Sequence, residues 1–445
     1  ARVATVAASA IEDTPIEKWK DAEARYNATV SAQLPKFVNG ARTLLSATVG
    51  ASPTVTNLAG RTGDSDKSVR TPVLNGIDVL ERSGFKELKG LKIGLVTNHT
   101  GRNLAGKQTI DILKEAPDVN LVSLFSPEHG IRGELDTEKI DDSKDEKTGL
   151  PVYSLYGVHR APQPGQLVGI DVLVYDLQDI GCRFYTYIST MGESMAAAAA
   201  AKIPFVVLDR VNPIRGSVIE GPVLSGERSF VGWHDIPVRH GMTVGELARM
   251  VNEERAFHAE LTVIPCEGWS RGDWFDATDL PWIHTSPNMR SLTEAALYPG
   301  VGLIEMCQVS VGRGTDVPFE RMGAPYVDDR RLAMELNNAG LAGVRFVPIR
   351  FTPTANKYAG QDCGGVQILL TDRESFRAVD LGMVLASTMQ RLYPAEFGIE
   401  AMSRLLLHGP TLEALRSGRD LAFIRNGWVE GLERFTARRS KYLLY

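Results

Sequence analysis

The sequence predicts an α/β protein. We expect a parallel sheet with helices on both faces, then a second, smaller α/β domain, and an appended helical arm at the amino terminus. Apolar strand-like runs alternate with helical segments between residues 76 and 264, which is typical of repeated β-α-β units. These runs are continuously apolar, as strands buried on both faces are. At 445 residues the chain is also too long for one hydrophobic core.

The first 70 residues differ from the rest of the chain. Apolar residues recur there at helical spacing and predict an amphipathic helix over about residues 14–34: Ile16, Trp19, Ala22, Tyr26 and Val30. A stretch rich in Ser, Thr, Gly and Asp at 46–68 predicts a linker. We therefore assign residues 1–70 to a helical arm and linker without catalytic residues.

Four strands are expected in the main domain, which we assign to residues 71–297. They are Lys92–Thr97, Val119–Phe125, Asp171–Tyr175 and Pro204–Leu208. Helices are expected at Lys107–Lys114 and Thr190–Lys202. Right-handed crossovers make such strands parallel, so the polar residues that follow them should meet at one edge of the sheet. These residues are Asn98, His99, Glu128, His129, Asp176, Asp179, Asp209 and Asn212.

The chain after this sheet predicts one more helix and strand, and then the second domain, residues 298–445. Thr243 and Glu246 have the spacing of a capping box for a helix over Thr243–Glu254, and Leu261–Ile264 is a short strand. Helices and strands expected further on are Arg330–Asn338, Val344–Phe351, Val366–Leu370, Asp380–Leu392 and Leu432–Leu443.

Composition excludes several classes of partner. A net charge of -5 without a basic block argues against nucleic acid or a membrane surface. The sequence has no run of about 18 apolar residues, so we expect no membrane-spanning helix. The four cysteines form no CxxC pair, so we expect buried thiols rather than a zinc site or a disulfide framework.

Glu128 is the strongest candidate for a proton-transferring residue. An apolar strand stops at Ser126-Pro127, and Glu128 and His129 follow at once, so the sheet edge should present both to a ligand. The alternative is a turn glutamate that meets only water. Hydrolysis of a glycosidic bond usually needs a second carboxyl group. Asp176 and Asp179 are the natural partners, unless they only cap loops.

Arg183, Tyr185 and Tyr187 follow these aspartates closely. The guanidinium of Arg183 suits a carboxylate or the vicinal oxygens of a sugar, and the tyrosines could stack on a ring. The alternatives are an arginine paired with Asp176 or Asp179, and tyrosines packed in the core.

Other motifs weigh against cofactors. His99, His129 and His240 lie in predicted loops without an HExxH pattern, so we expect no metal and assign His129 to substrate hydrogen bonding. The turn around Gly312-Arg313-Gly314 lacks the P-loop lysine. We expect it to present Arg313 to the cleft instead.

Several long motifs occur together and in order. They are Gly94–Gly101, Phe125–Gly130, Asp176–Gly181 with Arg183–Tyr187, Asp209–Pro213, His240–Thr243, Ser286–Met289, Ser310–Thr315 and Tyr442–Tyr445. Over residues 76–445 this pattern resembles the NamZ exo-β-N-acetylmuramidases. One departure is Glu305-Met306-Cys307-Gln308, where the family more often has Glu-Gly-Thr-Asn; Glu305 itself is retained.

The resemblance implies a Rossmann-like domain, a smaller α/β domain and an active site in the cleft between them. It implies release of N-acetylmuramic acid from the non-reducing ends of peptidoglycan fragments, with Glu128 as the catalytic glutamate. We expect the enzyme to need no cofactor. Asp179 or Asp176 remains our own inference for the second catalytic group. The residues assigned to substrate binding are Asn98, His99, His129, Gln178, Arg183, Tyr185, Tyr187, Asn212, His240, Asn288, Glu305 and Arg313.

Two other functions were weighed. A non-catalytic cell-wall sugar-binding protein on the same scaffold is the alternative to the enzyme. A nucleotide-dependent enzyme is disfavoured by the missing glycine fingerprint. A peptidoglycan substrate leads us to expect a secreted or periplasmic protein, although no signal peptide is visible in the chain.

Overall fold

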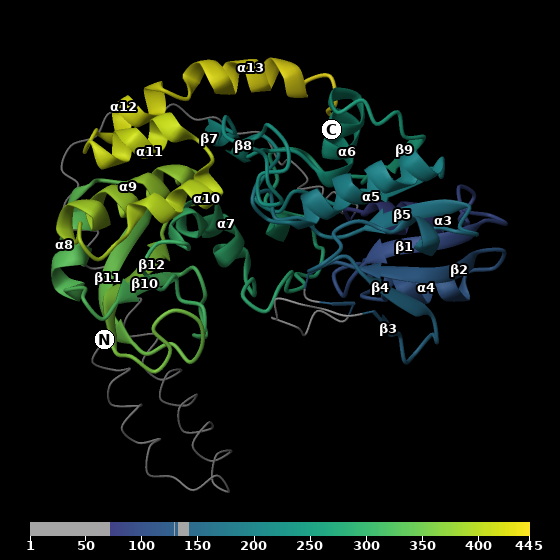
Figure 1. Ribbon diagram of the computed structural model, residues 1–445, viewed down its shortest axis with the longest axis horizontal. Coiled ribbons are helices and arrows are strands. Elements are labelled where there is room, and N and C mark those ends of the chain that lie inside the picture. Colours follow the sequence, from purple (N-terminus) through teal and green to yellow (C-terminus); the bar gives the residue numbers. More distant parts are fainter. Residues whose placement is uncertain (1–71, 129, 132–141) are drawn as a thin grey trace, which may run out of the picture. The chain divides into compact units, whose positions relative to one another are not determined.

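The computed structural model describes residues 72–128, 130–131 and 142–445 (Figure 1). The helix predicted over residues 14–34, the linker predicted after it, and His129 lie outside these residues. The described chain belongs to one unit that begins at Arg70.

The main sheet has the strand order β3-β4-β2-β1-β5-β6-β9. Its strands are β1 (Lys92–Thr97), β2 (Asn120–Ser126), β3 (Ser143–Lys144), β4 (Pro151–Ser154), β5 (Val172–Asp176), β6 (Phe205–Leu208) and β9 (Leu261–Ile264). All the neighbouring pairs are parallel except β3 with β4. The predicted parallel sheet is thus confirmed, with β3 and β4 as additional strands.

Alternate strand residues enter two separate apolar clusters, as a sheet covered on both faces requires. On one face Leu95 and Val174 pack with α3 (Gly76–Arg82) and α4 (Thr109–Glu115). On the other face Val96 and Tyr175 pack with α5 (Tyr187–Ala201) and α6 (Val244–Glu254). Helix α6 has the predicted capping box between Thr243 and Glu246.

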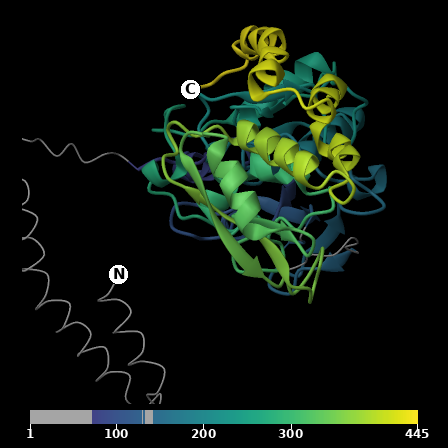
Figure 2. The same ribbon diagram turned by 90° about the vertical axis from the view of Figure 1, so that its left-hand side faces the viewer.

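The second lobe contains a three-stranded antiparallel sheet in the order β10-β12-β11. Its elements are β10 (Arg321–Ala324), α8 (Asp329–Asn338), β11 (Val344–Phe351), β12 (Cys363–Leu370) and α9 (Ala378–Leu392). Helix α8 packs on β11 and β12, and α9 packs on α8 (Figure 2).

Helix α7 (Leu292–Val301) crosses the position at which we divided the chain, residue 297. It packs closely against α9, where a Cβ atom on Gly300 would collide with the backbone of Ala378. A glycine is therefore required at this crossing.

The end of the chain returns to the first lobe. Helices α10 (Ser403–Leu406), α11 (Gly409–Arg416), α12 (Leu421–Asn426) and α13 (Val429–Arg439) lead back toward α6 (Figure 1). The Tyr445 hydroxyl then donates to Asp209 Oδ2 at 2.6 Å, and Arg249 Nη1 donates to the Tyr442 carbonyl at 2.8 Å. Strands β7 (Glu220–Val223) and β8 (Pro237–Arg239) form a small hairpin-like sheet contacted by α13.

Candidate active site

A cavity of about 170 Å³ lies beyond the carboxyl end of β2 and is lined by residues of both lobes. The first lobe contributes Glu128 and the turn before α5, and the second contributes Tyr298 and the segment after α7. The described residues that line it are Glu128, Phe184, Tyr185, Thr186, Tyr187, Val231, Ser286, Asn288, Met289, Tyr298, Glu305, Met306, Arg313, Phe319 and Leu405. Sites for drug-sized ligands usually have about 300–1,000 Å³, so this volume suits a single sugar.

Glu128 is half-buried at the cavity wall. The Thr186 hydroxyl donates to Glu128 Oε2 at 2.7 Å, and Thr186 is the N-cap residue of α5. The end of β2 and the start of α5 therefore place the two residues so that the neutral Thr186 hydroxyl holds one oxygen of the Glu128 carboxyl group.

Glu305 is the other carboxylate among the described lining residues. Arg313 Nη1 contacts Glu305 Oε1 at 2.7 Å, with the two side chains 27% and 13% exposed. Lys357 Nζ donates to the Glu305 backbone carbonyl at 2.6 Å, and burial lowers the pKa of this lysine. Glu305 is thus fixed through its backbone and its side chain, next to a permanent positive charge.

Aromatic rings form a continuous wall of the cavity. The ring centroids of Tyr185 and Tyr298 lie 6.0 Å apart, and those of Tyr298 and Phe319 lie 4.7 Å apart. The Tyr185 hydroxyl donates to Thr285 Oγ1 at 2.7 Å, and burial raises the pKa of Tyr185 well above its usual value. The tyrosines therefore stay neutral and offer ring faces on which a sugar can pack.

Asp176, which was predicted as a catalytic group, does not line this cavity. Its side chain has no exposed surface, and Arg210 Nε and Nη2 contact its two oxygens at 2.5 and 3.0 Å. Thr109 adds a third hydrogen bond at 2.5 Å. A carboxylate with this set of donors is part of a buried structural ion pair.

Asp179 is also buried and is absent from the described lining. Its Oδ2 atom accepts from the Gly181 backbone at 2.7 Å and lies 3.4 Å from His240 Nε2. After burial, the charge on Asp179 also contributes to the raised pKa of Tyr185, so this carboxylate lies near that tyrosine.

Arg183, which was predicted to bind the ligand, does not line this cavity. It is fully buried and donates to the carbonyl groups of Pro222, Ile236, Leu405 and Leu406 at 2.6–3.1 Å. Burial lowers its pKa to about 10. The guanidinium therefore holds backbone segments of both lobes together, and it pairs with neither aspartate considered for it.

The remaining predicted residues divide into two groups. Tyr185, Tyr187, Asn288, Glu305 and Arg313 line the cavity with Glu128. The others form hydrogen bonds that shape the loops behind it: Asn98 to the Tyr187 hydroxyl, His99 to the His284 carbonyl, Gln178 to the Val211 carbonyl, Asn212 to the Met242 carbonyl and His240 to the Met242 amide. An asparagine or histidine in a loop looks the same in sequence whether it lines a cavity or forms a hydrogen bond within the protein.

Several lining residues were not predicted. Thr186 and Ser286 lie inside the recognised motifs, next to predicted residues, and that proximity was the available signal. Tyr298 and Phe319 had none, because an aromatic residue that lines a cavity resembles a core aromatic in sequence.

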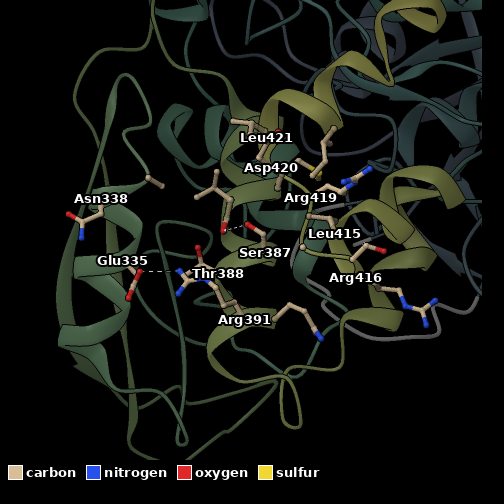
Figure 3. Close-up of a pocket in the computed structure, with 17 residues that line it drawn as sticks. Glu335, Asn338, Ser387, Thr388, Arg391, Leu415, Arg416, Arg419, Asp420 and Leu421 are labelled. Carbon is tan, nitrogen blue, oxygen red and sulfur yellow. Dashed lines mark hydrogen bonds and ion pairs between the residues drawn. The ribbon is translucent and has the colours of Figure 1, made fainter.

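A separate hollow of about 720 Å³ lies in the second lobe among α8, α9, α11 and α12 (Figure 3). Arg391 there pairs with Glu335 at 3.0 Å, and the hollow contains none of the predicted site residues.

The described residues contain no group of three or more His, Cys, Asp or Glu side chains able to hold a metal ion. All four cysteines are buried and free, which confirms their predicted state. Within the described ranges, no helix combines the length and apolarity needed to cross a membrane.

The fold and this cavity together define a class of protein. A parallel α/β domain and a smaller lobe enclose a one-sugar cavity that contains two carboxylates and an aromatic wall, features found in glycoside hydrolases.

Sequence comparison makes the assignment specific. The family model for exo-beta-N-acetylmuramidase NamZ, N-terminal, matches residues 93–293, and the C-terminal model matches residues 296–445. The chain therefore belongs to the NamZ exo-β-N-acetylmuramidase family, as its motifs predicted.

Individual relatives agree. The chain is 43% identical over 398 residues to the peptidoglycan beta-N-acetylmuramidase NamZ of Bacillus subtilis, covering 88% of this chain and 96% of that protein. Two crystal structures of DUF1343 family proteins from Bacteroides fragilis are also similar. One has a TM-score of 0.74 and 38% identity over 84% of this chain and all of that chain. The other has a TM-score of 0.70 and 32% identity over 84% of this chain and 99% of that chain.

Proposed function

We propose that this protein is a glycoside hydrolase that releases N-acetylmuramic acid from the non-reducing ends of peptidoglycan fragments. Family membership supports the activity. The observation that carries the mechanism is the presence of Glu128 and Glu305 in one cavity that suits a single sugar. Because peptidoglycan lies outside the cytoplasm, we also propose that the protein acts there.

Glu128 is the proposed general acid. It gives a proton to the glycosidic oxygen as the bond from that oxygen to the anomeric carbon breaks. Its one described side-chain partner is the hydroxyl of Thr186, a group that can donate to a carboxylate and accept from a carboxylic acid.

Glu305 is the proposed second carboxylate, in place of Asp176 and ahead of the buried Asp179. The guanidinium of Arg313 at 2.7 Å stabilises a negative charge on Glu305. Glu305 either removes a proton from the water whose oxygen bonds to the anomeric carbon, or bonds to that carbon itself; in the second case Glu128, now deprotonated, takes the proton from the water that hydrolyses the glycosyl-enzyme. The two glutamates thus have different neighbours, a hydroxyl for Glu128 and a guanidinium for Glu305.

Arg313 is the proposed partner of the lactyl carboxylate that distinguishes muramic acid from glucosamine. It lines the cavity, whereas Arg183 is occupied by backbone carbonyls. A guanidinium has five N–H donors, so contact with Glu305 through Nη1 is compatible with a substrate carboxylate.

The test compares the wild type with Glu128→Gln on two substrates. On a MurNAc-GlcNAc disaccharide we expect turnover to fall by about 10²-fold or more, because acid catalysis is lost. On an aryl muramide, whose leaving group needs little protonation, the loss should be much smaller.

Glu335→Gln, in the separate hollow of Figure 3, is the matched control and should retain full activity. Near-full activity of Glu128→Gln on the disaccharide would refute the acid assignment. A wild type that binds both substrates and releases no product would support the sugar-binding alternative.

A further inference from the structure

A second recess, an open groove of about 720 Å³, adjoins the cavity on the second lobe. Asn288 lines both the cavity and the groove, and the groove continues along the segment that follows Arg313. The described residues that line it are Pro287, Asn288, Arg290, Gly314, Thr315, Asp316, Arg321, Arg350, Phe351, Thr352, Thr354, Ala355 and Asn356.

The groove and the cavity share one loop framework. The Thr354 backbone amide and hydroxyl both donate to the Gly314 carbonyl at 2.8 Å. Gly314 has φ of +79° and lies against the backbone of Ala355, a position that only glycine fills without strain. The loop that presents Arg313 to the cavity therefore also forms the wall of the groove.

Arginines dominate the charge of the groove, with Asp316 as the one acid in its described lining. Arg290 donates to the carbonyl of Pro287 at 2.8 Å. Arg321 lies 3.4 Å from Asp316, and its buried Nε has no hydrogen-bond partner among the described residues. Arg350 forms an exposed ion pair with Asp362, which is worth little in water. The groove is thus suited to an anion.

We propose that this groove binds the part of the glycan beyond the scissile bond, and that its arginines recognise a lactyl carboxylate there. This inference depends on the proposed function. A one-sugar cavity leaves the remaining chain outside it. In peptide-free peptidoglycan strands, neutral N-acetylglucosamine alternates with anionic N-acetylmuramic acid, so the second sugar past the cleaved bond carries a free lactyl carboxylate. Guanidinium groups bind that planar anion well.

The proposal predicts a dependence on chain length. Binding energy from remote parts of a substrate can be used at the reacting centre. For the wild type we expect a peptide-free tetrasaccharide, MurNAc-GlcNAc-MurNAc-GlcNAc, to have about tenfold higher kcat/KM than the disaccharide, the usual worth of a charge-assisted hydrogen bond. Added salt should reduce this advantage, because it screens exposed charges.

The test measures kcat/KM on the disaccharide and the tetrasaccharide for the double variant Arg290→Gln/Arg350→Gln, with Arg416→Gln as the control. Arg416 is 51% exposed on the same lobe and lines the separate hollow of Figure 3. We expect the double variant to lose the tetrasaccharide advantage and to hydrolyse the disaccharide normally, whereas the control keeps both rates. The salt titration of the wild type tests the same point without any substitution.

Three results would overturn the groove assignment. They are equal wild-type rates on the two glycans, an equal loss on both in the double variant, and a tetrasaccharide advantage that ignores salt. The same tetrasaccharide with stem peptides, whose lactyl carboxyl groups are amidated, separates the possible carboxylates: an advantage seen only with this substrate refutes the lactyl assignment. A wild type that hydrolyses neither glycan refutes the proposed function itself.

Discussion

Carboxylates at the same edge of the main sheet have two different fates. Asp176 ends β5 and receives three hydrogen bonds from Arg210 and Thr109 inside the protein. Glu128 follows β2 and has one described side-chain partner, the Thr186 hydroxyl, at the wall of a cavity. Position at a strand end brings a carboxylate to this edge. The number of hydrogen-bond donors that the protein places around the carboxylate then decides whether it forms a buried structural interaction or can contact a substrate.

The arginines show the same division. Arg183 donates to four backbone carbonyls and has no exposed surface, while Arg313 is 27% exposed beside Glu305. The predictions below test this contrast between the buried polar network and the cavity.

The largest effect is expected for the buried ion pair. Asp176→Ala leaves Arg210 charged and unpaired in the interior, which should lower the free energy of unfolding by about 3–5 kcal/mol. Urea denaturation measures this. Asp362→Ala, which breaks the exposed pair with Arg350, should cost less than about 1 kcal/mol. Similar losses in the two variants would contradict the distinction.

The next prediction concerns pH and the buried Asp209. Burial raises its pKa from 3.8 to about 6. Between these values the unfolded chain has already lost the proton that the native state keeps, so stability falls as pH rises. This shift corresponds to about 3 kcal/mol.

Asp209→Asn removes this titration and supplies the reference. The unfolding free energy of the wild type minus that of the variant should decrease from pH 4 to pH 7, and should change little above that. A constant difference over this range would show that Asp209 does not titrate there.

Replacement of the second cavity carboxylate should affect activity rather than stability. Glu305→Gln should reduce turnover by about 10²-fold on both the disaccharide and the aryl muramide, because its role does not depend on the leaving group. Glu128→Gln, in contrast, should lose much less activity on the aryl muramide than on the disaccharide.

Asp179→Asn is the matched comparison, measured per folded molecule. We expect it to be more active than Glu305→Gln, because Asp179 is buried and does not line the cavity. The reverse order of activities would return the second catalytic role to Asp179.

The smallest effect is expected at the end of the chain. Tyr445→Phe removes the hydrogen bond to Asp209 and leaves the Cys266 amide without its 2.7 Å acceptor, while the ring can still pack on Trp269. We expect a loss of about 1–2 kcal/mol, measured by thermal or urea denaturation. Unchanged stability would show that this anchor contributes nothing to the fold.

Much of the fold could be predicted because its signals are local. The bounds of β1, β9 and β11 agree with the predicted strands, and Thr243 caps α6 as its spacing indicated. Short segments such as β4 and β10 lack a long apolar run, so they were missed. The helix predicted over Leu432–Leu443 instead spans Val429–Arg439.

The sequence by itself determined the parallel sheet, the edge at which the polar residues gather, and the family. The tertiary structure alone decided which of those residues meet a substrate. That choice depends on partners far away in the chain, such as Leu406 for Arg183 and Arg210 for Asp176. A polar side chain carries the same local pattern whether it is satisfied inside the protein or faces a cavity, and only packing distinguishes the two.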